Sequence, residues 1–421
     1  MRSGDRQVDL RGLEDACARI GCLFARSESR ARAADYVEGL LSSIGRKNSW
    51  QVAAHAGHAS PDGIQWLLTR APWSADALRD ITRSYAVEAL GDPRAAAVFD
   101  DVSFAKRGDK SVGVARQRVG LERRMENSQV GVFMAYASPK GTALVDRALY
   151  LPRPEWAEDM VRRKAAGVPE QVRFSTKAQL ANRMLARALA AGAPITAVVV
   201  GQACAGPSLR DYCVTRRIML IEEITARHLV DTRGDRPVEA GALARLIPPP
   251  AFERGYPGGG SAAMVRLGSA GADRHQTALL VRSRATALTG HLFFLCHAPQ
   301  WVPLDKLVAA ADTLPMTRQY IDRSRIEAGL DQYEVRKWEP WYRHITLSMF
   351  AMAYLAESRA IKHLNHLDFS SHSRIDRAVG SRWKSPRNAP SFGASGCRTF
   401  VHRGKFQHGH HVMPDHGRRI G

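Results

Sequence analysis

The hydrophobic pattern changes near residue 95, and this change constrains the fold more than any other feature of the chain. Residues 10–90 show helical spacing of apolar side chains and no strand-like run. Beyond them, β-rich runs come first and then alternate with helical patterns. The runs lie at 96–100, 111–116, 129–136, 142–151 and 195–200, and an amphipathic helix is expected at 176–191. This order predicts an α/β fold with a mixed sheet flanked by helices.

Three regions are expected along the 421 residues. Residues 10–90 form an N-terminal helical domain, residues 91–356 the α/β core, and residues 357–421 a basic, His-rich tail. The tail lacks periodic apolar residues, so we expect it to be disordered. Within the core, residues 233–273 are rich in Gly and Pro and are interpreted as a loop or an insertion. Order is expected to resume with strands at 277–282 and 291–296 and with helices from Pro303, about Pro315 and Trp341.

The charge balance points to a polyanionic partner. The chain carries 61 Lys and Arg against 41 Asp and Glu, which gives a net charge of +20 and a pI near 10.2. Neutralising phosphates with such a surface releases counterions, so a basic protein of this kind is suited to binding DNA. The alternative is a genome rich in G and C, which inflates Arg, Ala and Gly in any protein.

The cysteines and the apolar stretches indicate a cytoplasmic protein that does not enter a membrane. The six cysteines are scattered and show no zinc-like spacing, so they are interpreted as reduced thiols. No signal peptide is expected in the polar first ten residues, and apolar stretches such as 195–200 are too short to span a bilayer. Four tail histidines form either a metal site without defined geometry or a solvated segment; they are His408, His410, His411 and His416.

Several motifs distributed over residues 31–355 resemble insertion-sequence DDE transposases of the seven-oh-one group. The longest joins a basic, Trp-containing turn to an apolar helix at 329–347. The others lie at 46–50, 61–65, 98–100, 110–117, 126–133, 149–152 and 296–299. The resemblance implies a ribonuclease-H-like sheet, and it implies an enzyme that cuts DNA at element ends and joins the freed 3′-hydroxyl to a target strand. DNA would then be the partner, as element ends and target, and a homo-oligomer is possible.

The chemistry that this resemblance implies requires carboxylates from three chain elements. Two Mg²⁺ ions, roughly 3.5–4 Å apart, hold the attacking and leaving oxygens, and they need oxygen ligands. Asp100 ends an apolar strand-like run and fits the first position, as a catalytic residue and a metal ligand. Its alternative is an acid in a turn. If the strand continues, Asp101 would point to the other face.

The second and third carboxylates are not found where the resemblance places them. The second position falls on Val200, with Gly201 next, and neither residue can bind a cation. Glu222 and Glu223, one helix and one strand further on, are poor substitutes. The third position falls on Arg318. We therefore expect a transposase-family protein that is catalytically impaired, and the alternative is a non-catalytic DNA-binding remnant or a regulator of a related transposase.

Six basic residues are candidate DNA contacts. Lys106, Arg107 and Lys110 follow Asp100 and can reach phosphates beside the site. Arg325 takes the place of a family lysine, while Arg46 and Lys47 lie between two predicted N-terminal helices. For each of them the alternative is a solvated surface charge, and for the N-terminal domain it is a short helical bundle without a DNA contact.

Overall fold

The computed structural model describes residues 10–120, 124–232, 236–256, 260–270, 275–283, 290–299 and 301–380. The chain divides into two compact units, Met1–His366 and Leu367–Gly421. The sheet and the N-terminal helices belong to the first unit, and most of the second unit lies outside the described residues.

The N-terminal region is helical, as predicted. It consists of α1 (Leu10–Ile20), a 3-10 turn (Gly21–Leu23), α2 (Ser27–Leu41), α3 (Ser49–His55), α4 (Asp62–Thr69) and α5 (Ala75–Leu90). Two helix starts are fixed by side-chain caps, because Asn48 accepts a hydrogen bond from Gln51 N and Ser74 accepts one from Ala77 N. No strand occurs among the described residues before Ala96.

The predicted mixed sheet is confirmed, and it is compatible with a ribonuclease-H-like core. Its first strands are β1 (Ala96–Ala105), β2 (Ala115–Val119), β3 (Arg124–Ser138), β4 (Gly141–Leu149), β5 (Ala197–Val200) and β6 (Met219–Ile224). β3 pairs antiparallel with β1 on one edge and with β2 and then β4 on the other. β5 and β6 continue from β1 as parallel neighbours, so the carboxyl ends of β1, β5 and β6 lie side by side.

An antiparallel extension continues the sheet beyond β6. The order runs on through β12 (His291–Pro299), β11 (His275–Ser283), β10 (Gly260–Ala270) and β9 (Glu253–Tyr256). The interpretation of residues 233–273 as a loop is therefore wrong for β9 and β10, whose backbones are hydrogen-bonded into the sheet. A short β7–β8 pair (Leu229–Val230, Val238–Glu239), α9 (Ala240–Arg245) and a 3-10 turn (Pro249–Ala251) precede β9. The extension has a small hydrophobic core of its own that includes Leu279 and Val281.

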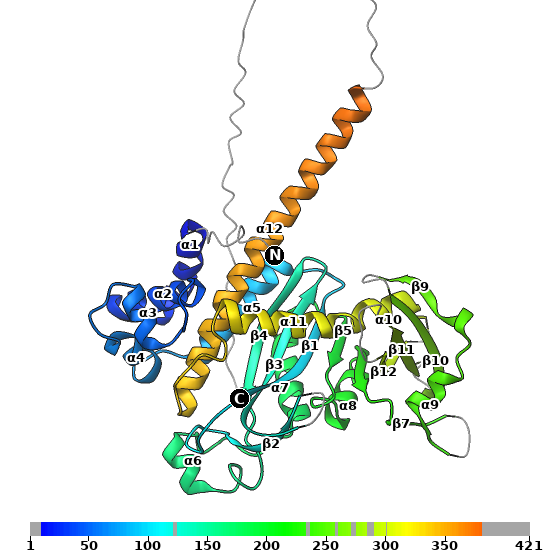
Figure 1. The fold of residues 1–421 in the computed structure, drawn as a ribbon, viewed down its shortest axis with the longest axis horizontal. Helices are drawn as coiled ribbons and strands as arrows, with labels where there is room; N and C mark the ends of the chain where they lie inside the picture. The colour runs from blue at the N-terminus through cyan, green and yellow to red at the C-terminus, as the bar shows by residue number, and fades with distance from the viewer. Residues whose placement is uncertain are drawn as a thin grey trace, which may run out of the picture. The chain divides into compact units, whose positions relative to one another are not determined.

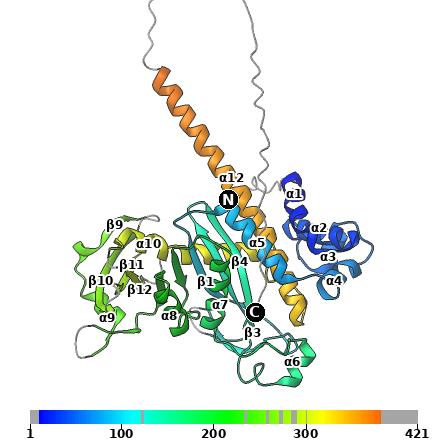
Figure 2. The ribbon, with the colours of Figure 1, turned by 180° about the vertical axis from the view of Figure 1, so that it is seen from behind.

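Helices cover both faces of the sheet. Figure 1 shows α11 (Thr313–Glu327) crossing the strands on the viewer's side, and the view from behind in Figure 2 shows α7 (Lys177–Ala190) on the opposite face. α7 starts with a capping box between Thr176 and Gln179, which fixes its first turn beside β1. The remaining helices of the core are α6 (Met160–Ala166), α8 (Pro207–Thr215) and α10 (Leu304–Ala311).

The last helix is α12 (Trp338–Gly380), and it extends past residue 357, where the tail was expected to begin. Disorder of the tail stays a prediction. Residues 381–421, with the four tail histidines, lie outside the described residues. Among the described residues, no helix has both the length and the apolar character needed to cross a membrane.

The start of α12 attaches the N-terminal helices to the core. The Tyr36 hydroxyl lies 2.8 Å from His344 Nδ1, and His344 Nε2 lies 3.1 Å from Gly329 O. Burial lowers the pKa of His344 to about 4, so the ring is neutral, donates from Nε2 and accepts at Nδ1. Arg343 Nη2 donates to Trp73 O at 3.0 Å. The long motif at 329–347 therefore has a structural role at this junction.

A cleft of carboxylates and arginines as the candidate active site

Three neighbouring strands bring Asp100, Gly201 and Glu223 into one row. Phe99 pairs with Val200 and Val200 with Glu222, so the next position along each strand is Asp100, Gly201 and Glu223. Strands are about 4.8 Å apart, which puts the Asp100 and Glu223 backbones roughly 10 Å from each other. The middle of the row carries no side chain, and this leaves space between the two carboxylates.

Arg318 from α11 fills that space and bridges the two acids. Its Nε donates to Asp100 Oδ2 at 2.6 Å, while Nη1 and Nη2 donate to the two carboxylate oxygens of Glu223 at 2.7 Å each. Asp100 is 7% exposed and Glu223 5%. A bidentate arginine–carboxylate pair with this burial is strong and fixed in direction. The guanidinium group therefore provides a permanent cation between the two carboxylates.

Gly201 is required for this arrangement. A Cβ atom at residue 201 would lie 2.1 Å from Asp100 Oδ1 and 3.1 Å from Arg318 Nη2. The first distance is far below any van der Waals contact, so a larger residue would push the Asp100 carboxylate away from Arg318. The absence of a side chain at this position, which the sequence showed only as the loss of a carboxylate, makes room for the ion pairs.

Burial and charge act in opposite directions on these groups. Burial raises the pKa of Asp100 to about 6, although Arg318 acts to lower it. Burial also disfavours the charged form of Arg318, but Glu223 and Asp100 outweigh this effect and the pKa of Arg318 is raised overall. Arg318 thus stays charged throughout the range in which proteins are folded.

The row opens into a cleft of about 690 Å³. Asp101, next to Asp100, forms an ion pair of 2.6 Å with Lys177 at the start of α7. Asp100 and Asp101 therefore contact α11 and α7 respectively. The charged residues that line the cleft are Asp100, Asp101, Arg118, Lys177, Glu223, Arg318, Asp322 and Arg325.

The basic residues named from the sequence lie in different environments. Arg325 lines the cleft, and its Nη2 donates to Ser103 O at 3.1 Å while its buried Nε has no hydrogen-bond partner. Lys106 lies 3.7 Å from the centre of the Tyr333 ring, and burial lowers its pKa to about 8. Three others are exposed and do not line the cleft; they are Arg46, Arg107 and Lys110.

Lys47 is placed differently from the other candidates. It is 4% exposed, and its ammonium group donates to three backbone oxygens: Leu40 O, Ser42 O at 3.0 Å and Glu327 O at 2.7 Å. These bonds use all three N–H groups and connect the end of α2 to the end of α11. The environment of Lys47 thus favours a structural role over a contact with DNA.

Sequence reasoning missed the position of Glu223. The sequence does not distinguish the two glutamates, but Glu222 forms an ion pair with Arg210 at 2.8 Å and lies 3.1 Å from His297 Nε2, and it does not line the cleft. The alternation of side chains along a strand would have separated the two residues, but only the register of β6 against β5 shows which one faces Asp100.

The residues present do not fit the pair of divalent cations that the resemblance implies. Mg²⁺ requires near-octahedral coordination by oxygen, and both oxygens of Glu223 and one of Asp100 are bound to Arg318. The Asp101 carboxylate is paired with Lys177. In the part of the chain that the structure describes, no group of three or more His, Cys, Asp or Glu is placed to hold a metal.

Comparison with known proteins gives the family of the chain. No curated protein matches the sequence. The family model described as "DDE superfamily endonuclease" matches residues 19–277, which is more than half of the 421 residues. The match includes the whole row of Asp100, Gly201 and Glu223 and ends before Arg318. The chain therefore belongs to the DDE superfamily endonuclease family.

Proposed function

We propose that this protein is an insertion-sequence transposase relative that binds DNA at the cleft but does not cut or join it. The observation that supports this proposal is the position of Arg318, whose guanidinium group bridges Asp100 and Glu223. The seven-oh-one group is the proposed origin within the family. Homo-oligomer formation and a cytoplasmic location stay predictions from the sequence.

The charge balance of the cleft supports the loss of metal-dependent chemistry. Four acids and four bases line it, so their formal charges cancel. A site that gathers two divalent cations needs an excess of carboxylate, because each cation must be compensated by its ligands. A guanidinium group can neutralise carboxylates, but it has no open coordination position to bind and activate a water molecule.

DNA binding does not depend on the lost chemistry. Arg325 and Arg118 line the cleft, and phosphate contacts by such side chains position DNA without reading its sequence. Exposed Arg46, Arg107 and Lys110 would add contacts outside the cleft. Because these contacts replace counterions on the DNA, affinity should fall steeply as salt is raised.

A combined binding and nicking experiment tests the proposal. Fluorescence anisotropy with labelled duplexes from the borders of the gene should give binding that weakens with salt and is unchanged by EDTA. Supercoiled plasmid incubated with the protein and Mg²⁺ or Mn²⁺ should remain intact. Nicking that disappears in Asp100→Ala would show that the protein is an active nuclease, and absence of binding at low salt would reject the DNA-binding function.

A further inference from the structure

A second cavity adjoins the cleft at the end of β4 and the start of α7. Its volume is about 530 Å³. Tyr150 and Thr176 line the cleft, whereas their neighbours Leu149, Leu151 and Ser175 line the second cavity, so these two chain segments form a shared wall. We call this second space the arginine cavity, after the five arginines that line it: Arg79, Arg147, Arg173, Arg183 and Arg187.

The arginine cavity carries an excess of positive charge. Against its five arginines, the acids in its lining are Asp76 and Glu339. Glu339 is itself paired with Arg343, at 3.2 Å. Burial acts to raise the pKa of Asp76, but Arg147 and Arg79 outweigh burial, so the pKa is lowered overall. Asp76 is therefore ionised and contributes one negative charge to the lining. The lining therefore has three more positive than negative charges. Two of these arginines are also paired with acids outside the lining, Arg79 with Asp80 at 3.0 Å and Arg187 with Asp146 at 2.9 Å.

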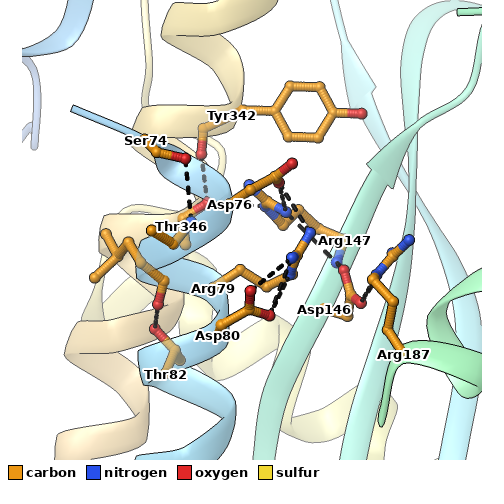
Figure 3. Close-up of polar contacts among 12 residues, drawn as sticks. Ser74, Asp76, Arg79, Asp80, Thr82, Asp146, Arg147, Arg187, Tyr342 and Thr346 are labelled. Atoms are coloured by element: carbon orange, nitrogen blue, oxygen red, sulfur yellow. Dashed lines mark hydrogen bonds and ion pairs between the residues drawn. The ribbon is translucent and has the colours of Figure 1, made fainter. Parts of the chain in front are cut away.

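Arg147 lines this cavity, and Figure 3 shows its side chain beside Asp76, Arg79 and Asp146. Its side chain is 1% exposed. Nε donates to Thr346 Oγ1 at 2.8 Å, Nη1 donates to Asp76 Oδ1 at 2.9 Å, and the guanidinium group lies 4.8 Å from the centre of the Tyr342 ring. Its Nη2 is buried and has no hydrogen-bond partner. A buried charged donor without an acceptor is unfavourable, so this atom is suited to an acceptor from a ligand.

The acids near Arg147 are shared with other arginines. The Asp76 carboxylate also accepts from Arg79 at 2.9 Å, and buried Asp146 pairs with Arg187 at 2.9 Å (Figure 3). At the rim, Arg183 is exposed and forms no ion pair with any described residue. The cavity thus combines a buried donor without an acceptor, Arg147 Nη2, with an exposed cation, Arg183.

We propose that the arginine cavity binds phosphate groups of the DNA strand that occupies the adjoining cleft, an inference that rests on the proposed function. Arginine matches phosphate through its fork of N–H donors, and several arginines in one cavity suit the two non-bridging oxygens of neighbouring phosphodiester groups better than a single carboxylate. The shared wall makes the two cavities adjacent, and the inference requires that one strand extends from the cleft to the arginine cavity. The phosphate chemistry is common to DNA and to small phosphate compounds, and the experiment separates these sources.

The test compares arginines at the rim with a matched arginine elsewhere. Arg183→Ala and Arg173→Ala change exposed side chains and should leave thermal unfolding unchanged. Each should weaken duplex binding by about threefold to tenfold and reduce the slope of log K against log salt by about 1. Arg266→Ala removes the same charge from an exposed position that lines neither cavity, and it should bind DNA within twofold of the wild type.

The outcomes separate this inference from the function on which it rests. If the wild type binds DNA and neither rim variant loses affinity, the inference that the arginine cavity binds DNA phosphates is overturned, and the proposed function stays intact. An equal loss of affinity in Arg266→Ala would also overturn the inference, because the loss would then follow from the lower net charge of the protein and not from the cavity. Pyrophosphate binding that the rim variants weaken, in a protein that binds no DNA, would assign the cavity to a small phosphate compound and reject both proposals.

Discussion

The cleft and the arginine cavity use the same residue types to opposite effect. In the cleft, Arg318 lies between two buried acids and satisfies both, so the charges that line the site cancel. In the arginine cavity, Arg147 shares Asp76 with Arg79 and keeps one buried donor unpaired, so positive charge remains. The difference shows that the ratio of carboxylates to guanidinium groups, and their geometry, decide whether a cavity is closed by its own ion pairs or open to an anion.

The largest expected effect comes from removing the internal cation. Arg318→Ala leaves two buried carboxylates without a partner and should lower the free energy of unfolding by about 2–4 kcal/mol, less than for a fully buried pair because the arginine side chain is 26% exposed. The freed acids should then bind Mg²⁺ or Mn²⁺, so the unfolding temperature should rise with added metal.

Arg323→Ala, on the same helix, is the matched control because its ion pair with Glu327 is exposed. It should change stability by less than about 1 kcal/mol and should give no metal response. Urea unfolding with EDTA or with metal measures both quantities. An Arg318→Ala protein as stable as the wild type would show that the bridge does not hold the two acids as described.

The titration of Asp100 should make the stability of the folded protein depend on pH. Its folded-state pKa of about 6 exceeds the ordinary 3.8, so the folded protein binds this proton more tightly than the unfolded chain. The contribution to stability is complete below pH 3.8 and is lost as the pH rises through about 6. The charges facing Asp100 are those of Arg318, Asp101 and Glu223.

Comparison with Asp100→Asn isolates this group, because the variant cannot titrate at residue 100. Between pH 4 and pH 6.5 the wild type should lose about 2–3 kcal/mol of stability relative to the variant. Urea unfolding of both proteins across this range measures the difference. Parallel pH profiles would contradict a raised pKa for Asp100.

The space above Gly201 can be tested by filling it. Gly201→Ala places a methyl group against Asp100 Oδ1, and the resulting weaker contact with Arg318 should cost about 1–2 kcal/mol. Gly45→Ala is the control, since a Cβ there has no neighbour within 4 Å. Equal unfolding free energies for the two variants would mean that Asp100 can move without losing its ion pair.

The smallest expected effect is on DNA affinity, and it comes from Asp76, the carboxylate that competes with a phosphate for the arginines of the cavity. Asp76→Asn removes a negative charge that binds both Arg147 and Arg79, so affinity for DNA should increase by about twofold to fivefold. Asp211→Asn, an exposed position on α8, should have no such effect. Weaker binding in Asp76→Asn would indicate that Asp76 orients Arg147 for the ligand and does not compete with it.

Several parts of the fold could be predicted because they depend on local periodicity. The alternation of runs from residue 96 predicted the strands β1, β3, β4 and β5, and the apolar face of residues 176–191 predicted α7. The strands of the extension were harder to predict. β10 forms a strand because it pairs with β11, and β9 forms one because it pairs with β10; no local pattern reveals either pairing.

Residues 313–326 illustrate the same limit. They lie between the motifs on which the family resemblance depends, and they form most of α11, with buried Leu314, Thr317, Tyr320, Ile321 and Ser324. Asp312 pairs with buried Arg282 at 3.0 Å. A helix needs only an apolar face of suitable spacing to pack on a sheet, so this stretch packs without any of those motifs.

The sequence by itself determined the strand of Asp100 and the residue types at positions 201 and 318, since each is a matter of residue type and spacing. Only the tertiary structure decided that Glu223 and not Glu222 faces Asp100, that Gly201 leaves space between them, and that Arg318 spans the gap. The reason is physical: ion pairs form over a few ångströms between residues that are about a hundred positions apart in the chain, and only the register of the strands sets that distance.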